Sequence, residues 1–344
     1  MGGSVFRSLG LQKAAGIALV LSLFAAVYLN FIVIMALAGT ETGEFCPTCP
    51  DWTDLDGWLA KKDAYEKAEM DASIAKSKGT AVTESDSVSN AEKAIDASKS
   101  YAAADLIAFA PPGESGQVIV DVRAPSDYRS GHLPGARSLY WKDLQKSGGL
   151  DESKAEAALC KAGINQSDNL LIYGGTSGEE AAFVFWALNY LGQKHVSLLD
   201  GGTDAAVQAG VSLVKNAPNP TPTNYTEHIV PWLQVTADNL ENLQSQGNVQ
   251  ILDARDFADF GRNSLTNAIP LTVDNLYENS RIKDAATLKE LLDRRSLDAT
   301  GIQIVYGTPQ AYRLFYSLKL MGYNATLLEG DWWKDTKYSK SIVT

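Results

Sequence analysis

The chain has 344 residues, of which 45% are hydrophobic and 21% charged, the composition of an ordinary globular protein of about two domains. Its formal net charge of −11 argues against a nucleic-acid partner, which would need clustered lysine and arginine, and against docking on anionic lipid. Three cysteines are too few for a disulfide framework.

The first predicted element is a membrane span. Residues 14–38 carry no charge and are almost all apolar. A helix of this length crosses a ~30 Å hydrocarbon core with some tilt, and it exceeds the roughly 7–15 apolar residues of a signal peptide. An uncleaved anchor in the lipid bilayer is therefore favoured. A cleaved signal peptide and a buried core helix are the alternatives.

The flanks of this span predict its orientation. Arg7 and Lys13 lie in the preceding segment, residues 1–13, whereas acidic residues follow the span. Basic flanks stay in the cytoplasm. We expect a single-pass membrane protein with a cytoplasmic N-terminus and its domains on the periplasmic or extracytoplasmic side.

A stalk is predicted over residues 39–97. It contains Cys46 and Cys49 in a Cys-Pro-Thr-Cys sequence, which indicates a local or intermolecular disulfide or a redox pair. Two thiolates cannot complete a tetrahedral zinc site, so no metal site is expected. Helices are predicted at 57–78 and from near Ala91, separated by a polar linker. The stalk is either a spacer or a docking surface for a membrane partner.

The rest of the chain aligns with itself at a nearly constant offset, which chance does not explain. Three segments of the first copy match three of the second, in the order Val118–Arg123 with Gln250–Arg255, Asn169–Gly174 with Gln303–Gly307, and Leu198–Gly202 with Leu327–Asp331.

Short apolar runs alternate with helical stretches in both copies, the clearest helices being Ala181–Leu191 and Leu314–Met321. This pattern is typical of an α/β fold in which helices cover both faces of a parallel sheet. Three prolines within residues 216–226 indicate a linker. We therefore predict one domain over residues 98–215 and a second over 227–344.

Asp121-Val-Arg123, Tyr128, Gly131-His-Leu-Pro-Gly-Ala136 and Leu199–Gly202 together resemble the rhodanese family. The resemblance extends from near Ser98 to near Tyr338 and is weaker in the second copy, where Ser264 replaces His132. Two such domains in one chain are similar to the tandem thiosulfate sulfurtransferases. The resemblance implies two rhodanese-like domains, each a parallel sheet flanked by helices.

In that family, the loop after the Tyr-ended strand holds a cysteine. Main-chain N–H groups and a helix dipole lower the pKa of its thiol and stabilise a persulfide. The resemblance places Gly174 and Gly307 at this position, so no catalytic residue is expected, and no cofactor is implied. The emptied pocket loops also contain Gly175, Thr176, Ser177, Gly178, Glu179 and Glu180 in the first copy, and Thr308, Gln310 and Arg313 in the second.

Other residues are weak substitutes for the missing nucleophile. Ser177 and Thr176 have no expected base, because His132 belongs to the structural turn of the family and His195 is expected to be exposed. Cys160 is expected to be a buried small hydrophobe in a helix over residues 152–161. The first loop is acidic and the second has only Arg313, so an anionic sulfur donor would bind poorly.

These features favour a pseudoenzyme that acts as a binding or scaffold subunit, with the subunits of a membrane complex as partners. The competing predictions are a sulfurtransferase that uses Cys46 and Cys49, and a sensor that binds a small anion in the degenerate pockets.

Overall fold

The structure is a computed structural model that describes residues 101–344 except 112–115, 147–148, 246, 331–338 and 341–344. The predicted span 14–38, the Cys46–Cys49 pair and both predicted stalk helices lie outside these residues. None of the helices in the described part of the chain is long and apolar enough to cross a bilayer. The membrane anchor therefore stays a prediction.

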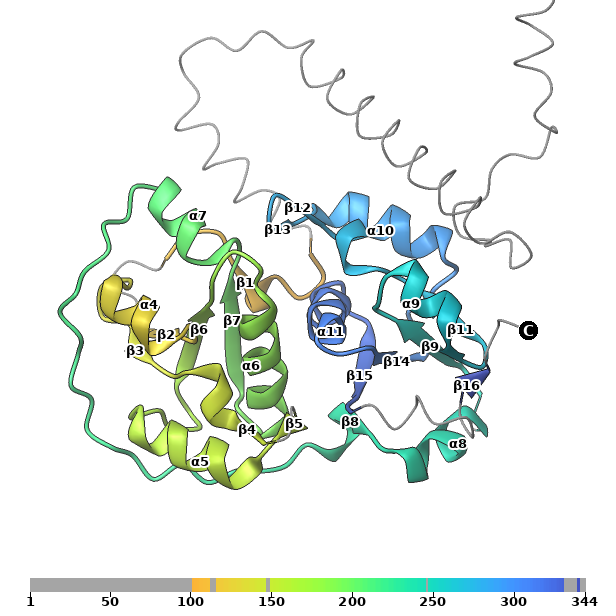
Figure 1. Cartoon of the computed structure of the whole chain (residues 1–344), viewed down its shortest axis with the longest axis horizontal. Coiled ribbons are helices and arrows are strands. Elements are labelled where there is room, and N and C mark those ends of the chain that lie inside the picture. The colour runs from red at the N-terminus through yellow and green to blue at the C-terminus, as the bar shows by residue number, and fades with distance from the viewer. Residues whose placement is uncertain (1–100, 112–115, 147–148, 246, 331–338, 341–344) are drawn as a thin grey trace, which may run out of the picture. The chain divides into compact units, whose positions relative to one another are not determined.

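Two α/β domains follow one another along the chain, each built on a five-stranded parallel sheet (Figure 1). The first sheet has the order β1-β7-β6-β2-β3, with β1 Ile107–Ala108, β2 Val118–Asp121, β3 Arg137–Ser138, β6 Asn169–Tyr173 and β7 His195–Leu199. The second has the order β11-β9-β14-β15-β8, with β8 Gln234–Val235, β9 Val249–Asp253, β11 Ala268–Pro270, β14 Ile302–Tyr306 and β15 Asn324–Leu328. The two orders match strand for strand when one is reversed, so the predicted repeat is a structural repeat.

Apart from one helix in each domain, the helices and short elements also recur in the same order. The first domain has η1 Ala104–Leu106, α4 Pro125–Ser130, η2 Trp141–Leu144, the hairpin β4 Gln145–Lys146 with β5 Gly149–Leu150, α5 Glu152–Lys161, α6 Glu179–Tyr190 and α7 Gly202–Gln208. The second has η3 Pro231–Leu233, α8 Ala237–Ser245, α9 Phe257–Arg262, η4 Val273–Asn275, the hairpin β12 Tyr277–Glu278 with β13 Arg281–Ile282, α10 Ala285–Arg294 and α11 Gln310–Leu320. In addition, β10 Ser264–Leu265 pairs with β16 Ser339–Lys340.

Helices cover both faces of each sheet, as the alternating side chains of β6 show. Leu170 and Ile172 belong to the apolar cluster that contains α6, whereas Leu171 and Tyr173 pack with Tyr128 of α4. These four side chains are fully buried, whereas Asn169 at the start of β6 is exposed. A parallel strand that is buried on both faces needs a continuous apolar run, and for this reason the sequence predicts a strand here.

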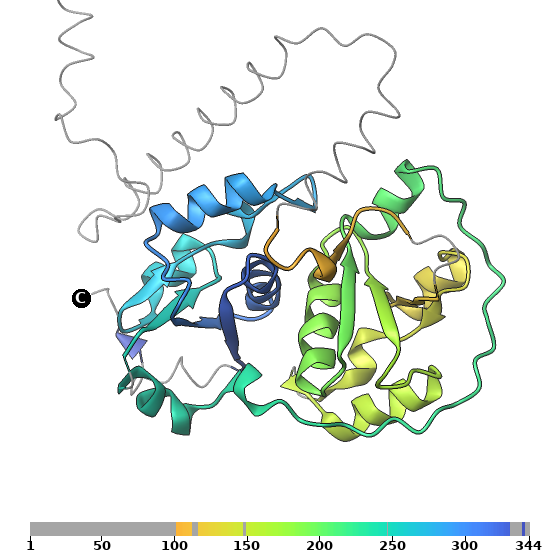
Figure 2. The same cartoon turned by 180° about the vertical axis from the view of Figure 1, so that it is seen from behind.

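The two domains pack through α6 and α11, which face each other in Figure 1 and again in Figure 2. Phe183 meets Tyr312 edge-on with ring centroids 5.1 Å apart, and Phe185 meets Tyr316 in the same way at 5.0 Å. The aromatic cluster continues from Phe185 to Phe315. Because α6 is covered by its own sheet on one side and by α11 on the other, it is apolar around almost its whole circumference.

The segment predicted as a linker is fixed against the first domain. The backbone N–H of Tyr225 donates to Cys160 Sγ at 3.2 Å, and that of Thr223 donates to the carbonyl of Cys160 at 3.0 Å. Tyr225 is buried, and His228 N–H donates to Leu191 O. Cys160 lies in α5 as expected but is half-buried and hydrogen-bonded rather than a fully buried apolar residue.

Replacing Phe185 by alanine should destabilise the protein by about 3–5 kcal/mol, the usual cost of a large cavity in a core. Its side chain is 1% exposed and contacts both Phe315 and Tyr316. Urea unfolding followed by circular dichroism measures the change. The control is Val207→Ala on α7, where the side chain is 48% exposed and the expected change is within about 0.5 kcal/mol. Equal effects of the two changes would contradict the assigned interface.

Candidate functional site

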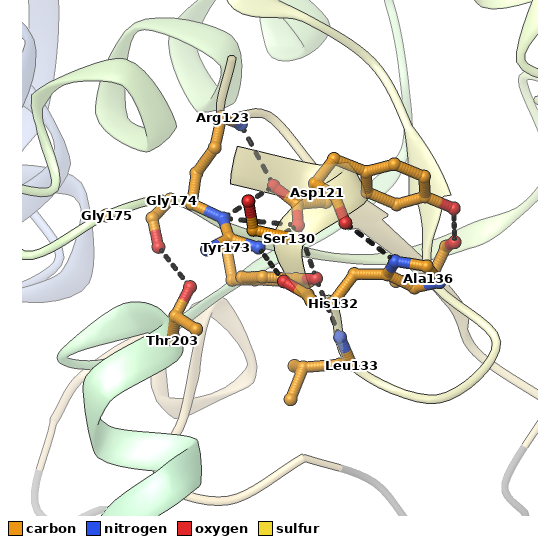
Figure 3. Close-up of polar contacts among 12 residues, drawn as sticks. Asp121, Arg123, Ser130, His132, Leu133, Ala136, Tyr173, Gly174, Gly175 and Thr203 are labelled. Atoms are coloured by element: carbon orange, nitrogen blue, oxygen red, sulfur yellow. Dashed lines mark hydrogen bonds and ion pairs between the residues drawn. The ribbon is translucent and has the colours of Figure 1, made fainter. Parts of the chain in front are cut away.

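A cluster of the buried Asp121 and Tyr173 with the partly buried Arg123 supports the candidate site in the first domain (Figure 3). Arg123 donates to both carboxylate oxygens of Asp121, the shortest contact being 2.6 Å, and its Nη2 also donates to the carbonyl of Gly131 at 2.8 Å. The Tyr173 hydroxyl donates to Asp121 Oδ2 at 2.6 Å and accepts from Leu133 N–H. Burial beside the carboxylate raises the pKa of Tyr173 far above its usual value. The end of β6, and hence the loop after it, is thereby fixed.

The second domain builds the same cluster from the equivalent residues. Arg255 donates to Asp253 Oδ2 and to the carbonyl of Asn263, both at 2.6 Å. The Tyr306 hydroxyl accepts from Leu265 N–H, and its pKa is raised by burial and by Asp253. Both arginines also lie over the ring of the strand-ending tyrosine, with 5.6 Å from Cζ to the ring centroid. These strand-end residues tie loops together.

His132 is a structural residue of the first domain. Its ring is fully buried and stacks on Tyr128 with centroids 3.9 Å apart. Its Nδ1 contacts Tyr128 O at 2.9 Å, and its backbone exchanges hydrogen bonds with Val214. His195 is exposed at the start of β7, as expected from the sequence. Both histidines lie in the described part of the chain, and neither is hydrogen-bonded there to Ser177 or Thr176.

The first loop, 174–178, is closed by the side chain of Glu180. Glu180 Oε1 accepts from Gly175 N–H at 2.8 Å and Oε2 accepts from the Ser177 hydroxyl at 3.0 Å. A Cβ atom placed on Gly174 would lie 2.9 Å from Glu180 Cγ and 3.2 Å from its carboxylate oxygen. A carboxylate therefore crowds the space where a side chain of residue 174 would project.

Two further contacts complete this loop. The carbonyl of Gly174 accepts from the backbone and hydroxyl of Thr203, at 3.2 and 3.1 Å (Figure 3). The Thr176 hydroxyl donates to Asp204 Oδ2 at 2.6 Å. The hydroxyls of Thr176 and Ser177 both donate to carboxylates, so they are not available to hold an anion.

The second loop is closed in a different way. It has only three residues, 307–309, before α11 begins. Gly307 has φ +93°, a left-handed conformation, and a Cβ there would lie 2.5 Å from Arg255 Cγ. Arg255 cannot easily move, because its guanidinium is held by Asp253 and by the Asn263 carbonyl. Residue 307 therefore has to be glycine in this arrangement.

A small cavity of about 40 Å³ lies between the first loop and the second domain. Its volume holds a few waters rather than a large ligand. It is lined by Gly174, Gly175, Thr176, Ser177, Gly178, Ala181, Ala182, Leu198, Leu199, Asp200, Gly201, Gly202, Tyr277, Ser280, Arg313 and Tyr316.

Groups of opposite charge lie beside this cavity. Arg313 stacks on Tyr277, with 3.7 Å from its Cζ to the ring centroid. Asp200 is 8% exposed, and burial raises the pKa of its carboxyl to about 6, although Arg281 and Arg313 act to lower it. Two arginines, Arg281 and Arg313, face this buried acid, whereas the hydroxyls of the first loop donate to carboxylates.

The structure brings together part of the predicted site. The loop residues 174–178 share the cavity with Arg313, which comes from the second domain. Gly307, Thr308 and Gln310 are not among the lining residues, so the two loops do not form one pocket. Asp200 lies within the repeated segment Leu198–Gly202, but the sequence did not predict it as a site residue. Nor did the sequence predict the residues that the second domain contributes, Tyr277, Ser280 and Tyr316.

Comparison with known proteins agrees with this geometry. The family model described as the rhodanese-like domain matches residues 109–209 and again 236–335. The chain belongs to the rhodanese-like family. Each matched range covers four of the five strands of one sheet, which confirms the resemblance to the rhodanese family and the α/β fold class.

Relatives of this rhodanese-like chain include a thiosulfate sulfurtransferase of Corynebacterium glutamicum, 28% identical over 233 residues, which covers 60% of this chain and 77% of the relative. Among solved structures, the 3-mercaptopyruvate sulfotransferase SseA of Escherichia coli has a TM-score of 0.57 at 21% identity, covering 64% of this chain and 94% of that one. The anaerobic ergothioneine biosynthesis enzyme of Chlorobium limicola has a TM-score of 0.59 at 16% identity, covering 66% and 64%. The solved structures share the fold.

Gly307→Ala tests the closure of the second rhodanese-like loop. The left-handed backbone costs about 1–2 kcal/mol for a residue with a side chain. Overpacking against Arg255 should add about 1–3 kcal/mol in the free energy of unfolding.

The matched control is Gly210→Ala, because Gly210 has φ +88° but open space where a Cβ atom would project. Only the backbone cost is expected there. Urea unfolding of both variants measures the difference, and equal destabilisation would contradict the steric closure by Arg255.

Proposed function

We propose that this protein is a membrane-anchored, extracytoplasmic pseudoenzyme whose two rhodanese-like domains act as a binding or scaffold module within a membrane complex. The anchor and its orientation rest on the sequence of residues 1–38. The loss of activity rests on the two loops. Small-anion sensing is not favoured, because carboxylates accept the loop's hydrogen bonds.

One observation carries the pseudoenzyme proposal. The resemblance aligns Gly174 and Gly307 with the family nucleophile, and in both domains a charged side chain crowds the space beside the glycine. Glu180 does so in the first domain and Arg255 in the second. Persulfide chemistry needs a thiolate at this place.

The two closures differ in how readily they open. Glu180 is a partly exposed side chain held by two hydrogen bonds, and Gly174 has no left-handed backbone that would exclude a side chain. Arg255 is buried in an ion pair, and Gly307 is left-handed. The first domain is therefore the one in which a thiol could be restored.

The competing function is sulfur transfer, because the relative in Corynebacterium glutamicum is a thiosulfate sulfurtransferase. In this chain the transferred sulfur would need a cysteine outside both loops. Cys160 accepts a hydrogen bond from Tyr225 N–H and lies in α5, away from the residues that line the cavity. Cys46 and Cys49 are the remaining thiols of the sequence.

Thiosulfate:cyanide sulfurtransferase assays of the full-length protein separate these functions. The wild type should give no turnover above a variant in which Cys46, Cys49 and Cys160 are all serine. Turnover well above that variant would contradict the pseudoenzyme proposal, and its loss in Cys46→Ser/Cys49→Ser alone would assign it to the stalk pair.

Restoring the thiol tests the role of Glu180. Gly174→Cys alone should stay close to background, because Glu180 crowds the new thiol and its charge raises the thiol pKa. Adding Glu180→Ala should raise turnover at least about tenfold, the change in thiolate fraction for one pKa unit. Gly307→Cys is the control and should be inactive and destabilised. Equal turnover of Gly174→Cys with and without Glu180→Ala would contradict the blocking role.

Extraction in mild detergent tests the scaffold role. The tagged full-length protein should copurify with stoichiometric partner subunits at native abundance. A version in which residues 101–344 are removed should lose those partners. Recovery of the intact protein alone, as a clean monomer, would contradict the scaffold role.

A further inference from the structure

The two rhodanese-like domains are joined by a reciprocal pair of hydrogen bonds. Asp200 of the first domain accepts from the backbone N–H of Ile282 in β13, at 2.9 Å from its Oδ1. Glu329 of the second domain accepts from the backbone N–H of Leu150 in β5, at 3.2 Å from its Oε1. Each domain therefore docks one carboxyl group on a hairpin of the other.

The four residues occupy equivalent places in the internal repeat. Asp200 directly follows β7, and Glu329 directly follows β15, the matching strand of the second sheet. Leu150 and Ile282 each end the second strand of the matching hairpins. The contacts are thus related by an approximate twofold exchange of the domains, which also relates Phe185 to Phe315 across α6 and α11.

Both carboxyl groups are largely removed from water. Asp200 faces the charged Arg281, at 3.8 Å, and Arg313, together with the hydroxyls of Tyr101, Tyr277 and Tyr316. Burial outweighs the arginines and raises the pKa of Asp200 to about 6.

The surroundings of Glu329 contain no cation among the partners that the structure describes. Tyr312 and Gln234 donate to its oxygens at 2.8 and 3.0 Å. Tyr190, which donates to Glu152, faces it from the first domain. Burial raises the pKa of Glu329, although its three donors lower it.

We propose that this reciprocal carboxyl pair is a proton-operated lock, which holds the two domains together more tightly as the pH falls. A neutral carboxyl group still accepts from the backbone N–H through its carbonyl oxygen, and it does not carry a charge into the interface. The cavity beside Asp200 gives its hydroxyl room for a water partner. This proposal does not depend on the proposed scaffold function.

The direction of the pH dependence follows from the difference in the pKa of Asp200 between the docked and the separated domains. When the domains separate, Asp200 returns to water and to its ordinary pKa near 3.8, below its value of about 6 in the docked state. Docking therefore takes up a proton between these values. The stabilisation of docking by Asp200 is fully present below about pH 4 and is lost as the pH rises through about 6. For these two pKa values, docking should be about tenfold more favourable at pH 5 than at pH 7.

Hydrogen exchange of the full-length protein measures this equilibrium, because separation frees the amide of Ile282. Exchange rates at pH 5 and pH 7 are divided by the intrinsic rates at each pH to give protection factors. Protection of Ile282 should be about tenfold higher at pH 5. Ile172, inside the first sheet, serves as an internal reference for opening of the domain itself.

Matched variants distinguish the lock from a general effect of pH. Asp200→Asn keeps the acceptor and removes the charge, so its Ile282 protection should lose the roughly tenfold change that Asp200 contributes and, at pH 7, should be higher than in the wild type. Glu329→Gln should remove the contribution of Glu329 in the same way, and the double variant Asp200→Asn/Glu329→Gln should show equal Ile282 protection at both pH values. Asp238→Asn removes an exposed charge on α8 and should leave the wild-type profile unchanged. Equal protection of wild-type Ile282 at pH 5 and pH 7, or a tenfold change that persists in the double variant Asp200→Asn/Glu329→Gln, would overturn the proposal.

Discussion

The structure around both loops depends on one charged group taken out of water, the carboxylate that ends β2 in the first domain and β9 in the second. A buried carboxylate is costly unless it is paired and fully hydrogen-bonded. Arg123 and Arg255 pair with these carboxylates and also donate hydrogen bonds to the loop carbonyls of Gly131 and Asn263. Through the strand-ending tyrosines, the same carboxylates set the start of loops 174–178 and 307–309. In the second domain, the arginine of this ion pair also crowds the space beside Gly307.

The fold was largely readable from the sequence, because parallel strands buried on both faces must be continuous apolar runs. Asn169–Tyr173 and its repeat show this pattern, and the helix over Glu152–Lys161 has the predicted bounds. The sequence did not predict the packing of α6 against α11, because an apolar helix can be covered either by its own sheet or by a neighbouring domain. The predicted linker carries three prolines, yet its later residues are fixed by hydrogen bonds to Cys160 that no local pattern encodes.

The site was predictable only at the level of residue identity. The sequence places glycine at 174 and 307, but the side chains that crowd those glycines come from elsewhere. Glu180 reaches back from the first turn of its own helix, and Arg255 reaches across from the end of a neighbouring strand. The contribution of Arg313 to the cavity of the other domain depends on how the two domains pack, which is a long-range property. The role of Asp200 also depends on domain packing, because its carboxyl group accepts a hydrogen bond from the hairpin of the second domain.

We propose that the rhodanese-like scaffold persists twice in a chain that does not transfer sulfur. The most direct measurement is mass spectrometry of the reduced full-length protein after incubation with thiosulfate, with persulfide quantified on each cysteine. We expect no stoichiometric persulfide on Cys46, Cys49 or Cys160. A stoichiometric persulfide on any of them, discharged by cyanide, would contradict it.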